Sequence, residues 1–274
     1  MIRNYIKRRL KSYFLSGLQH EIDVLKYELD MSKSRFDVGD SLLRKFRDDK
    51  KSDIYARAYE EESPLVTVCI ATYNRGGVLV KRSLASVLQQ EYTNLEIIVV
   101  GDSCTDDTDY LISNINDPRI KFVNLHERGQ YPEEPEWRWM VAGTAPTNKA
   151  LELANGAFIT HLDDDDEHPS DRISKLVNFI QETRADLVWH PFRWEVEPGH
   201  WRLNKAEEFK LGHVTTSSIF YHNWFKNIPW SAESYKYREP GDWNRLRKIQ
   251  YLGARLRRYP EPLLTHYRER NQQN

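Results

Sequence analysis

The stretch FITHLDDDDE, residues 158–167, decides how the rest of this chain is interpreted. Four consecutive aspartates, Asp163 to Asp166, follow a short apolar run, and a helical pattern begins after Pro169. Neighbouring carboxylates repel each other, at a cost of about 1 kcal/mol per pair at 4 Å in water and about 4 kcal/mol at an effective dielectric of 20. Mg²⁺ or Mn²⁺ would offset this charge, since both prefer carboxylate and phosphate oxygens. The run therefore predicts a metal–diphosphate site, with a solvated acidic loop as the alternative.

Strand and helix patterns alternate on both sides of the aspartates. Apolar runs predict strands at residues 65–71, 95–100, 120–125, 157–162 and 186–190. Helical spacing of apolar residues follows most of them, at 80–88, 105–115, 146–154 and 173–180. The Pro- and Trp-rich segment 126–144 is long for an internal loop, which favours a lid or a binding loop. Repeated β-α-β units predict a parallel α/β sheet with right-handed crossovers.

Polar clusters stand at the carboxyl ends of three predicted strands. They are Tyr73-Asn74-Arg75, Gly101-Asp102-Ser103 and Asp163-Asp164-Asp165. Ligands of open α/β sheets bind outside these strand ends, so we expect one ligand to touch all three clusters. The chain has neither a G-x-G-x-x-G fingerprint after the first strand nor a Walker A lysine loop. This leaves a nucleotide held by side chains and bridged through a metal on its phosphates.

Several of these segments resemble the glycosyltransferases of family 2 that have a GT-A fold. They are PLVTVCIATYNR at 64–75, SVLQQ at 86–90, GDSCTDDT at 101–108, NKALELANG at 148–156 and LDDDD at 162–166. The resemblance covers roughly residues 64–190, in order and in spacing. It implies a mostly parallel central sheet flanked by helices, behind an N-terminal helical extension. It also implies transfer of a sugar from a nucleotide-diphosphate donor to a glycan or lipid-linked glycan, as in cell-surface polysaccharide synthesis.

The resemblance assigns roles to individual residues. Ala71, Tyr73, Arg75 and Asp102 would bind the donor nucleotide, with Tyr73 packed on the base and Asp102 hydrogen-bonded to it. Asp163 and Asp164 would bind the sugar-diphosphate, and Asp165 would bind Mn²⁺ or Mg²⁺. Apart from the resemblance, the segment after the strand-like run 262–265 could close over the phosphates, with either His266 as a further metal ligand or Arg268 as a cation. Two positions depart from the family pattern: Gly101 stands where an aspartate is common, and Thr147 replaces an arginine.

Asp242 is the predicted catalytic residue. It lies in the first turn of a helical pattern that continues through Leu246 and Ile249, where the helix dipole alone would favour a carboxylate. The resemblance implies that Asp242 deprotonates the acceptor hydroxyl, although Gly241 precedes it where the family has glutamate. An inverting transfer needs one such base, and the metal would offset charge on the departing diphosphate.

The first 62 residues read separately from the rest. An apolar stripe recurs every three to four positions, at Ile2, Ile6, Leu10, Phe14, Leu18, Ile22, Leu25 and Leu29. Its start carries Arg3, Lys7, Arg8, Arg9 and Lys11 and no acid. Residues 1–30 therefore predict a peripheral membrane contact or self-association, or a helix packed on its own domain.

Residues 48–62 are expected to be a charged linker. We expect a division into residues 1–62 and a transferase domain at 63–274. Within that domain, 63–190 would bind the nucleotide sugar, and the Trp-rich part 191–274 would bind the acceptor and supply the base.

Composition limits the other functions. The chain has 274 residues, a net charge of −1 and no apolar run approaching 18 residues, so neither a transmembrane helix nor nucleic-acid binding is expected. The start is too polar for a secretory signal. The two cysteines, Cys69 and Cys104, have no metal-type spacing and favour a reducing compartment. We expect a cytoplasmic protein, peripheral at the inner face of the membrane.

Three other functions fit parts of the pattern. A sugar-nucleotide-binding module without activity would explain the departures at Gly101, Thr147 and Gly241. A phosphohydrolase would use Asp163 as nucleophile and Asp165 as acid, but its motif would stand near the start of the domain. A calcium loop of EF-hand type would need glycine at His168 and glutamate at Ser174. The retained aspartates favour an active transferase.

Overall fold

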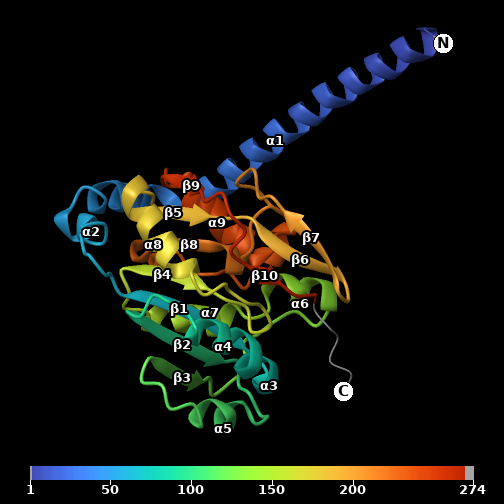
Figure 1. The fold of residues 1–274 in the computed structure, drawn as a ribbon. Helices are drawn as coiled ribbons and strands as arrows, with labels where there is room; N and C mark the ends of the chain where they lie inside the picture. The colour runs from blue at the N-terminus through green and yellow to red at the C-terminus, as the bar shows by residue number, and fades with distance from the viewer. Residues whose placement is uncertain (1, 269–274) are drawn as a thin grey trace.

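One seven-stranded sheet organises the protein (Figure 1). The computed structural model describes residues 2–268, with the side chains of Leu15 and of residues 17–268. The strand order is β3-β2-β1-β4-β8-β5-β9. The strands are β1 Val66–Thr72, β2 Leu95–Gly101, β3 Ile120–Asn124, β4 Phe158–His161, β5 Leu187–Trp189, β8 Ile219–His222 and β9 Leu256–Arg258. Only β8 runs antiparallel to its neighbours, so the predicted mostly parallel sheet is confirmed.

Apolar side chains cover both faces of the sheet. Alternate residues of β1, Val66, Val68 and Ile70, enter one core cluster, and Cys69 points into the other. Helices pack on both sides, which is why the central strands are apolar at nearly every position. These helices are α3 Gly76–Leu79, α4 Ala85–Leu88, α5 Thr108–Ser113, α7 Thr144–Leu153 and α8 Arg172–Thr183. A π-helical turn, Val80–Leu84, joins α3 to α4.

The last third adds a smaller sheet and one α-helix beside the main sheet. Strands β10 Thr265–His266, β6 Phe192–Glu197 and β7 His200–Asn204 form this second sheet. Helix α6 Pro135–Val141 lies in the segment predicted to be a lid or binding loop. Helix α9 Gly241–Tyr251 carries Asp242 in its first turn, as the sequence predicted. A 3₁₀ turn, Thr216–Ser218, leads directly into β8.

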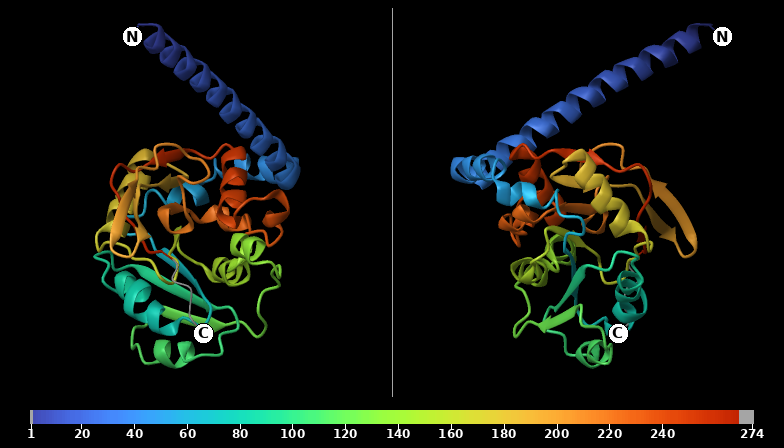
Figure 2. Two further views of the ribbon diagram at one scale, coloured as in Figure 1. Left: turned by 90° about the vertical axis from the view of Figure 1, so that its right-hand side faces the viewer. Right: turned by 60° about the vertical axis from the view of Figure 1, so that its left-hand side comes forward.

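A long N-terminal helix, α1 Ile2–Asp49, projects from the body of the protein (Figures 1 and 2). Gly39 interrupts it with φ 70°, a left-handed conformation that glycine adopts without strain. The projecting part carries exposed Leu18, Ile22, Leu25 and Leu29 of the predicted stripe. The side chains of Ile2, Ile6, Leu10 and Phe14, and of the basic residues among them, lie outside the described residues. Among the described helices, none is long and apolar enough to cross a membrane.

The second half of α1 packs on α9. The indole Nε1 of Trp243 donates to Asp30 at 3.2 Å, and Lys33 pairs with Glu239 at 2.8 Å. Arg247 is fully buried and binds both Asp37 and Glu239 at 2.9 Å. A buried guanidinium needs such partners, because an uncompensated charge in the interior is strongly destabilising. The helix that carries Asp242 is therefore held in place by α1.

The predicted charged linker at 48–62 is wrong. Ser52 caps a short helix, α2 Asp53–Arg57, by accepting a hydrogen bond from the Tyr55 amide. Tyr55 is buried, stacks on His222 at 3.7 Å and donates its hydroxyl to Asp186 at 2.7 Å. The charged residues dominate the composition of the segment, but they lie on its outer side while the aromatic rings face the core. The division of the chain at residue 63 stays a prediction.

A neighbouring pair in α2 tests whether this segment belongs to the core. Tyr55→Ala should lower the free energy of unfolding by about 3–5 kcal/mol, as for other buried aromatic residues. Ile54→Ala, at a position that is 81% exposed, should change it by less than about 0.5 kcal/mol. Urea unfolding followed by circular dichroism measures both, and equal small effects would show that residues 48–62 are a linker after all.

Candidate active site

The three predicted clusters meet at one edge of the main sheet. Strand β1 lies between β2 and β4 and runs parallel to both, so the loops that follow these strands are neighbours. The Thr72 hydroxyl at the end of β1 donates to Asp164 at 2.7 Å. The Thr72 carbonyl accepts a hydrogen bond from the Asp102 amide at 2.8 Å. Contacts from β1 thus reach both other turns.

Asn74 ties the turn after β1 to the turn after β2. Its φ of 50° is left-handed, a region where asparagine is several-fold enriched among non-glycine residues. The side-chain oxygen accepts hydrogen bonds from the amides of Thr105 at 2.8 Å and Asp106 at 3.3 Å. This pairing fixes the direction in which the next residue, Arg75, leaves the turn.

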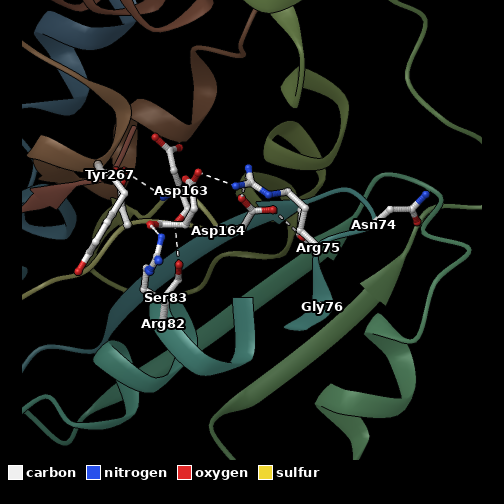
Figure 3. Close-up of polar contacts among 12 residues, drawn as sticks. Asn74, Arg75, Gly76, Arg82, Ser83, Asp163, Asp164 and Tyr267 are labelled. Atoms are coloured by element: carbon white, nitrogen blue, oxygen red, sulfur yellow. Dashed lines mark hydrogen bonds and ion pairs between the residues drawn. The ribbon is translucent and has the colours of Figure 1, made fainter. Parts of the chain in front are cut away.

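Arg75 binds two of the four aspartates (Figure 3). Its guanidinium lies 3.0 Å from a carboxylate oxygen of Asp164 and 2.6 Å from one of Asp165. Burial raises the pKa of Asp164 to about 6, even though Arg75 and the Thr72 hydroxyl both stabilise its ionised form. The positive charge of Arg75 alone therefore does not offset the negative charge of the aspartates in this turn.

Asp163, Asp166 and His266 form a group that could hold a metal ion. One ligand atom from each lies within 4.8 Å of the others. His266 Nδ1 is 2.8 Å from Asp166, which also accepts the Tyr267 amide at 3.0 Å. Carboxylate oxygens with one imidazole suit Mn²⁺, so the residues present fit such an ion. Of the two predicted metal ligands, His266 belongs to this group, whereas Asp165 pairs with Arg75 instead. The group also contains Asp166, which the sequence indicated only as one of the four consecutive aspartates.

Charge in this group is unbalanced. Burial, followed by repulsion from Asp166, raises the pKa of Asp163 well above its usual value. Burial also raises the pKa of Asp166, despite its hydrogen bond to His266. Burial alone would lower the pKa of His266, but the bond to Asp166 and the nearby carboxylates raise it to about 9. A protonated His266 partly neutralises the aspartates, and a divalent cation would do so more completely.

A cavity of about 480 Å³ opens over these residues. All eight residues predicted for donor and metal line it: Ala71, Tyr73, Arg75, Asp102, Asp163, Asp164, Asp165 and His266. The sequence analysis missed Arg128, whose guanidinium carbon lies 3.7 Å from the centre of the Tyr73 ring. Asp102 accepts hydrogen bonds from the Gly129 amide and the Tyr131 hydroxyl, each at 2.8 Å. The long segment after β3 was the only sequence signal for these contacts.

A second cavity, of about 650 Å³, adjoins the first. Asp163, His266 and Trp230 line both cavities. The second also contains Asp242 and the exposed indole rings of Trp139 and Trp194. Two hydrogen bonds with Asn148, at 2.8 and 3.0 Å, hold the Trp230 backbone between the two spaces. The Asp242 carboxylate and the aromatic rings thus line a second space on the far side of Asp163 and His266.

Asp242 lies in the second cavity with a raised pKa. Burial raises its pKa to about 6, while the Trp243 amide donates to it at 2.6 Å and opposes the shift. A carboxylate with a pKa near the working pH is ionised yet basic enough to accept a proton. Asp242 is therefore distinguished by its raised pKa and its place in the cavity, in addition to its favourable position at a helix N-terminus.

Packing bears on two of the departures from the family pattern. A Cβ atom at Gly101 would lie 2.6 Å from the Asn124 side chain, so an aspartate there would require Asn124 to shift. A Cβ atom at Gly241 would lie 3.3 Å from the Met140 carbonyl and 3.5 Å from the Trp230 ring. Thr147 lines the 480 Å³ cavity, where it cannot supply the positive charge of an arginine.

Charge removal at two of the aspartates should affect the stability of the metal-free protein differently. Because the pKa of Asp163 is raised in the folded chain, ionising Asp163 costs more in the folded than in the unfolded chain, and stability falls as the pH rises toward that pKa. Asp163→Asn should therefore stabilise the fold at pH 8. Asp165→Asn removes the same charge but breaks the pair with Arg75, and no gain is expected. Thermal unfolding in EDTA measures both; stabilisation by Asp165→Asn alone would contradict this account.

Comparison with known proteins connects this site to a family. A model of glycosyl transferase family 2 matches residues 67–132 and 143–248, more than half of the chain. The Campylobacter jejuni GalNAc(5)-diNAcBac-PP-undecaprenol beta-1,3-glucosyltransferase is 34% identical over 126 residues, 45% of this chain and 37% of that protein. The Escherichia coli UDP-Glc:alpha-D-GlcNAc-diphosphoundecaprenol beta-1,3-glucosyltransferase WfaP is 32% identical over 117 residues, 43% of this chain and 41% of that protein. The matched region thus spans less than half the length of these relatives.

Solved structures share the fold. Residues 1–349 of S. aureus TarS, in complex with UDP-GlcNAc, superpose with a TM-score of 0.58 at 19% identity, covering 76% of this chain and 60% of that one. The mannosyltransferase PcManGT from Pyrobaculum calidifontis, in complex with GDP-Man and Mn²⁺, superposes with a TM-score of 0.54 at 16% identity, covering 80% and 65%. The chain therefore belongs to glycosyl transferase family 2 and has the GT-A fold that its motifs predicted.

Proposed function

We propose that this protein moves a sugar from a nucleotide-diphosphate donor to a hydroxyl of a glycan or lipid-linked glycan, with inversion at the anomeric carbon and with a divalent metal. One observation carries the proposal: two adjoining cavities share Asp163 and His266, and Asp242 lies in the cavity away from the other aspartates. The undecaprenol-linked substrates in the names of two relatives support a lipid-linked acceptor in polysaccharide synthesis.

The donor would occupy the 480 Å³ cavity. The base would lie near Tyr73 and Asp102. A carboxylate offers about four acceptor positions, so Asp102 can still accept a hydrogen bond from the base while it holds Gly129 and Tyr131. The diphosphate would lie beside the aspartates and Arg75.

His266, Asp163 and Asp166 would hold Mn²⁺ or Mg²⁺, with Asp165 as a further ligand if its carboxylate leaves Arg75. The bound ion would offset negative charge on the departing diphosphate. The present pairing of Asp166 with His266 keeps the imidazole oriented toward Asp163.

The acceptor would occupy the 650 Å³ cavity, where Trp139, Trp194 and Trp230 offer flat apolar faces to sugar rings. Asp242 would take the proton from the acceptor hydroxyl as its oxygen forms a bond to the anomeric carbon. The bond from that carbon to the diphosphate oxygen breaks, and the diphosphate leaves on the opposite side. In this assignment most donor contacts come from residues 63–190, joined by His266, and residues 191–274 supply the base and most acceptor contacts, joined by Trp139.

Asp242→Asn should reduce turnover by about 10²–10⁴-fold, the range of general base catalysis, and leave donor affinity nearly unchanged. In the unaltered enzyme, kcat/KM should fall with unit slope below pH about 6 as Asp242 gains a proton. Asp109→Asn, at an exposed aspartate in the first turn of α5, is the matched control and should change neither quantity. Undiminished turnover by Asp242→Asn would remove Asp242 from the mechanism.

In the unaltered protein, Mn²⁺ should increase the affinity for a nucleotide sugar by about tenfold or more. His266→Ala should abolish this increase and leave the affinity without metal unchanged. Titration calorimetry with and without Mn²⁺ measures both. Metal affinity should rise with pH up to about 9, because His266 must lose its proton to bind an ion. His200→Ala, at an exposed histidine in β7, serves as control. Mn²⁺ stimulation that survives His266→Ala would place the ion elsewhere.

A further inference from the structure

The projecting half of α1 carries an apolar face that no described residue covers. Residues 17–29 are all exposed, and the helix stands clear of the body in each view (Figures 1 and 2). Exposed apolar side chains along α1 are Leu15, Leu18, Ile22, Val24, Leu25, Tyr27, Leu29 and Phe36, with exposed fractions from 37% to 89%. Contiguous apolar surface of this kind marks an interaction site.

Six of these eight side chains follow the spacing of a coiled coil. Leu15, Leu18, Ile22, Leu25, Leu29 and Phe36 alternate at intervals of three and four, with Ser32 at the one polar position. We call this set the seam. Its average repeat of 3.5 residues is that of a left-handed coiled coil, with Leu15, Ile22, Leu29 and Phe36 at a positions and the others at d. One heptad earlier the same positions are Arg8 and Lys11, so the seam begins at Leu15.

The body of the protein leaves the seam open. Asp30, Ser34 and Asp37 bind α9, and Lys33 binds Glu239 just before it. These residues occupy b, f, b and e positions, to one side of the seam. Phe36, at a seam position between them, is 89% exposed. The same helix can therefore be anchored to its own domain and still offer the seam to another molecule.

Charges beside the seam favour a second copy in parallel orientation. Glu21 and Glu28 occupy g positions, and Lys26 and Lys33 occupy e positions. In a parallel, in-register pair each g side chain meets the e side chain five residues on in the other helix, which sets Glu21 against Lys26. An antiparallel pair would oppose like charges. Because Lys33 already binds Glu239, Glu21 and Lys26 are the pair available for this contact.

We propose that a second copy of this chain covers the seam and forms a parallel two-stranded coiled coil over residues 15–36. An anionic membrane fits this part of the helix less well, because residues 19–30 contain four acids and one base: Glu21, Asp23, Glu28, Asp30 and Lys26. Parallel pairing would place both transferase bodies at the same end of the coiled coil. The proposal does not rest on the proposed function, since it involves no residue of the two cavities.

Sedimentation equilibrium of the full chain tests the pairing. The unaltered protein should sediment at twice the chain mass of 32.5 kDa. Leu25→Glu places a charge in the seam at a site that is 63% exposed in the single chain, so it should weaken association at least tenfold without unfolding the protein. Tyr27→Glu adds the same charge to the same helix away from the seam and should leave the dimer intact.

Charge exchange and cross-linking test the orientation. Glu21→Lys and Lys26→Glu should each weaken the dimer, and the double variant should restore it. Leu25→Cys should form a disulfide-linked dimer on mild oxidation, which the unaltered chain should not form under the same conditions. Donor affinity should be the same in all these variants, which separates this proposal from the one on catalysis.

Two results would overturn the dimer. One is a single-chain mass for the unaltered protein at 100 µM, the same as that of Leu25→Glu. The other is co-sedimentation of single chains with phosphatidylglycerol vesicles that Leu25→Glu abolishes, which would make the seam a membrane surface.

Discussion

Four adjacent carboxylates on one turn are the constraint that the rest of the structure depends on. No local arrangement can relieve their repulsion, so the compensating groups come from distant parts of the chain. Arg75 comes from the turn after β1, and His266 lies in β10, one hundred residues after Asp166. Even so, the pKa values of Asp163, Asp164 and Asp166 remain raised. The fold thus holds more carboxylates than the nearby cations neutralise, at the place where a metal ion and a diphosphate would meet.

The turn also explains how the two halves of the protein act on one site. The turns after the parallel strands line the 480 Å³ cavity, and α9 with the small sheet lines much of the cavity that contains Asp242. Strand β10 brings His266 to the boundary by pairing with β6. Trp230, held by Asn148 of α7, separates the spaces. Each cavity is therefore built from both halves of the chain, and neither half completes the site alone.

Sequence patterns predicted the central strands to within about a residue, because burial on both faces leaves little room for polar side chains. The meeting of the three turns followed from the parallel order of those strands. The pairing of Asp165 with Arg75 could not be foreseen, since adjacent residues of a turn point in different directions. Spacing gave no sign of the contact between Asp166 and His266, or of Arg128 on Tyr73, because both depend on irregular segments. In α2, surface charges concealed the burial of Tyr55.

The buried Arg247 makes the N-terminal helix difficult to exchange between proteins. Its guanidinium is satisfied by Ser34 and Asp37 on one helix and by Glu239 at the entry to another. A foreign helix grafted at Gly39 would remove two of these three partners and weaken the pairing of the buried charge, unless it carried groups equivalent to Ser34 and Asp37. A chimera joined at Gly39 would keep this buried charge fully paired only if residues 34, 37, 239 and 247 came from the same parent, and a chimera that split them would loosen the helix that carries Asp242.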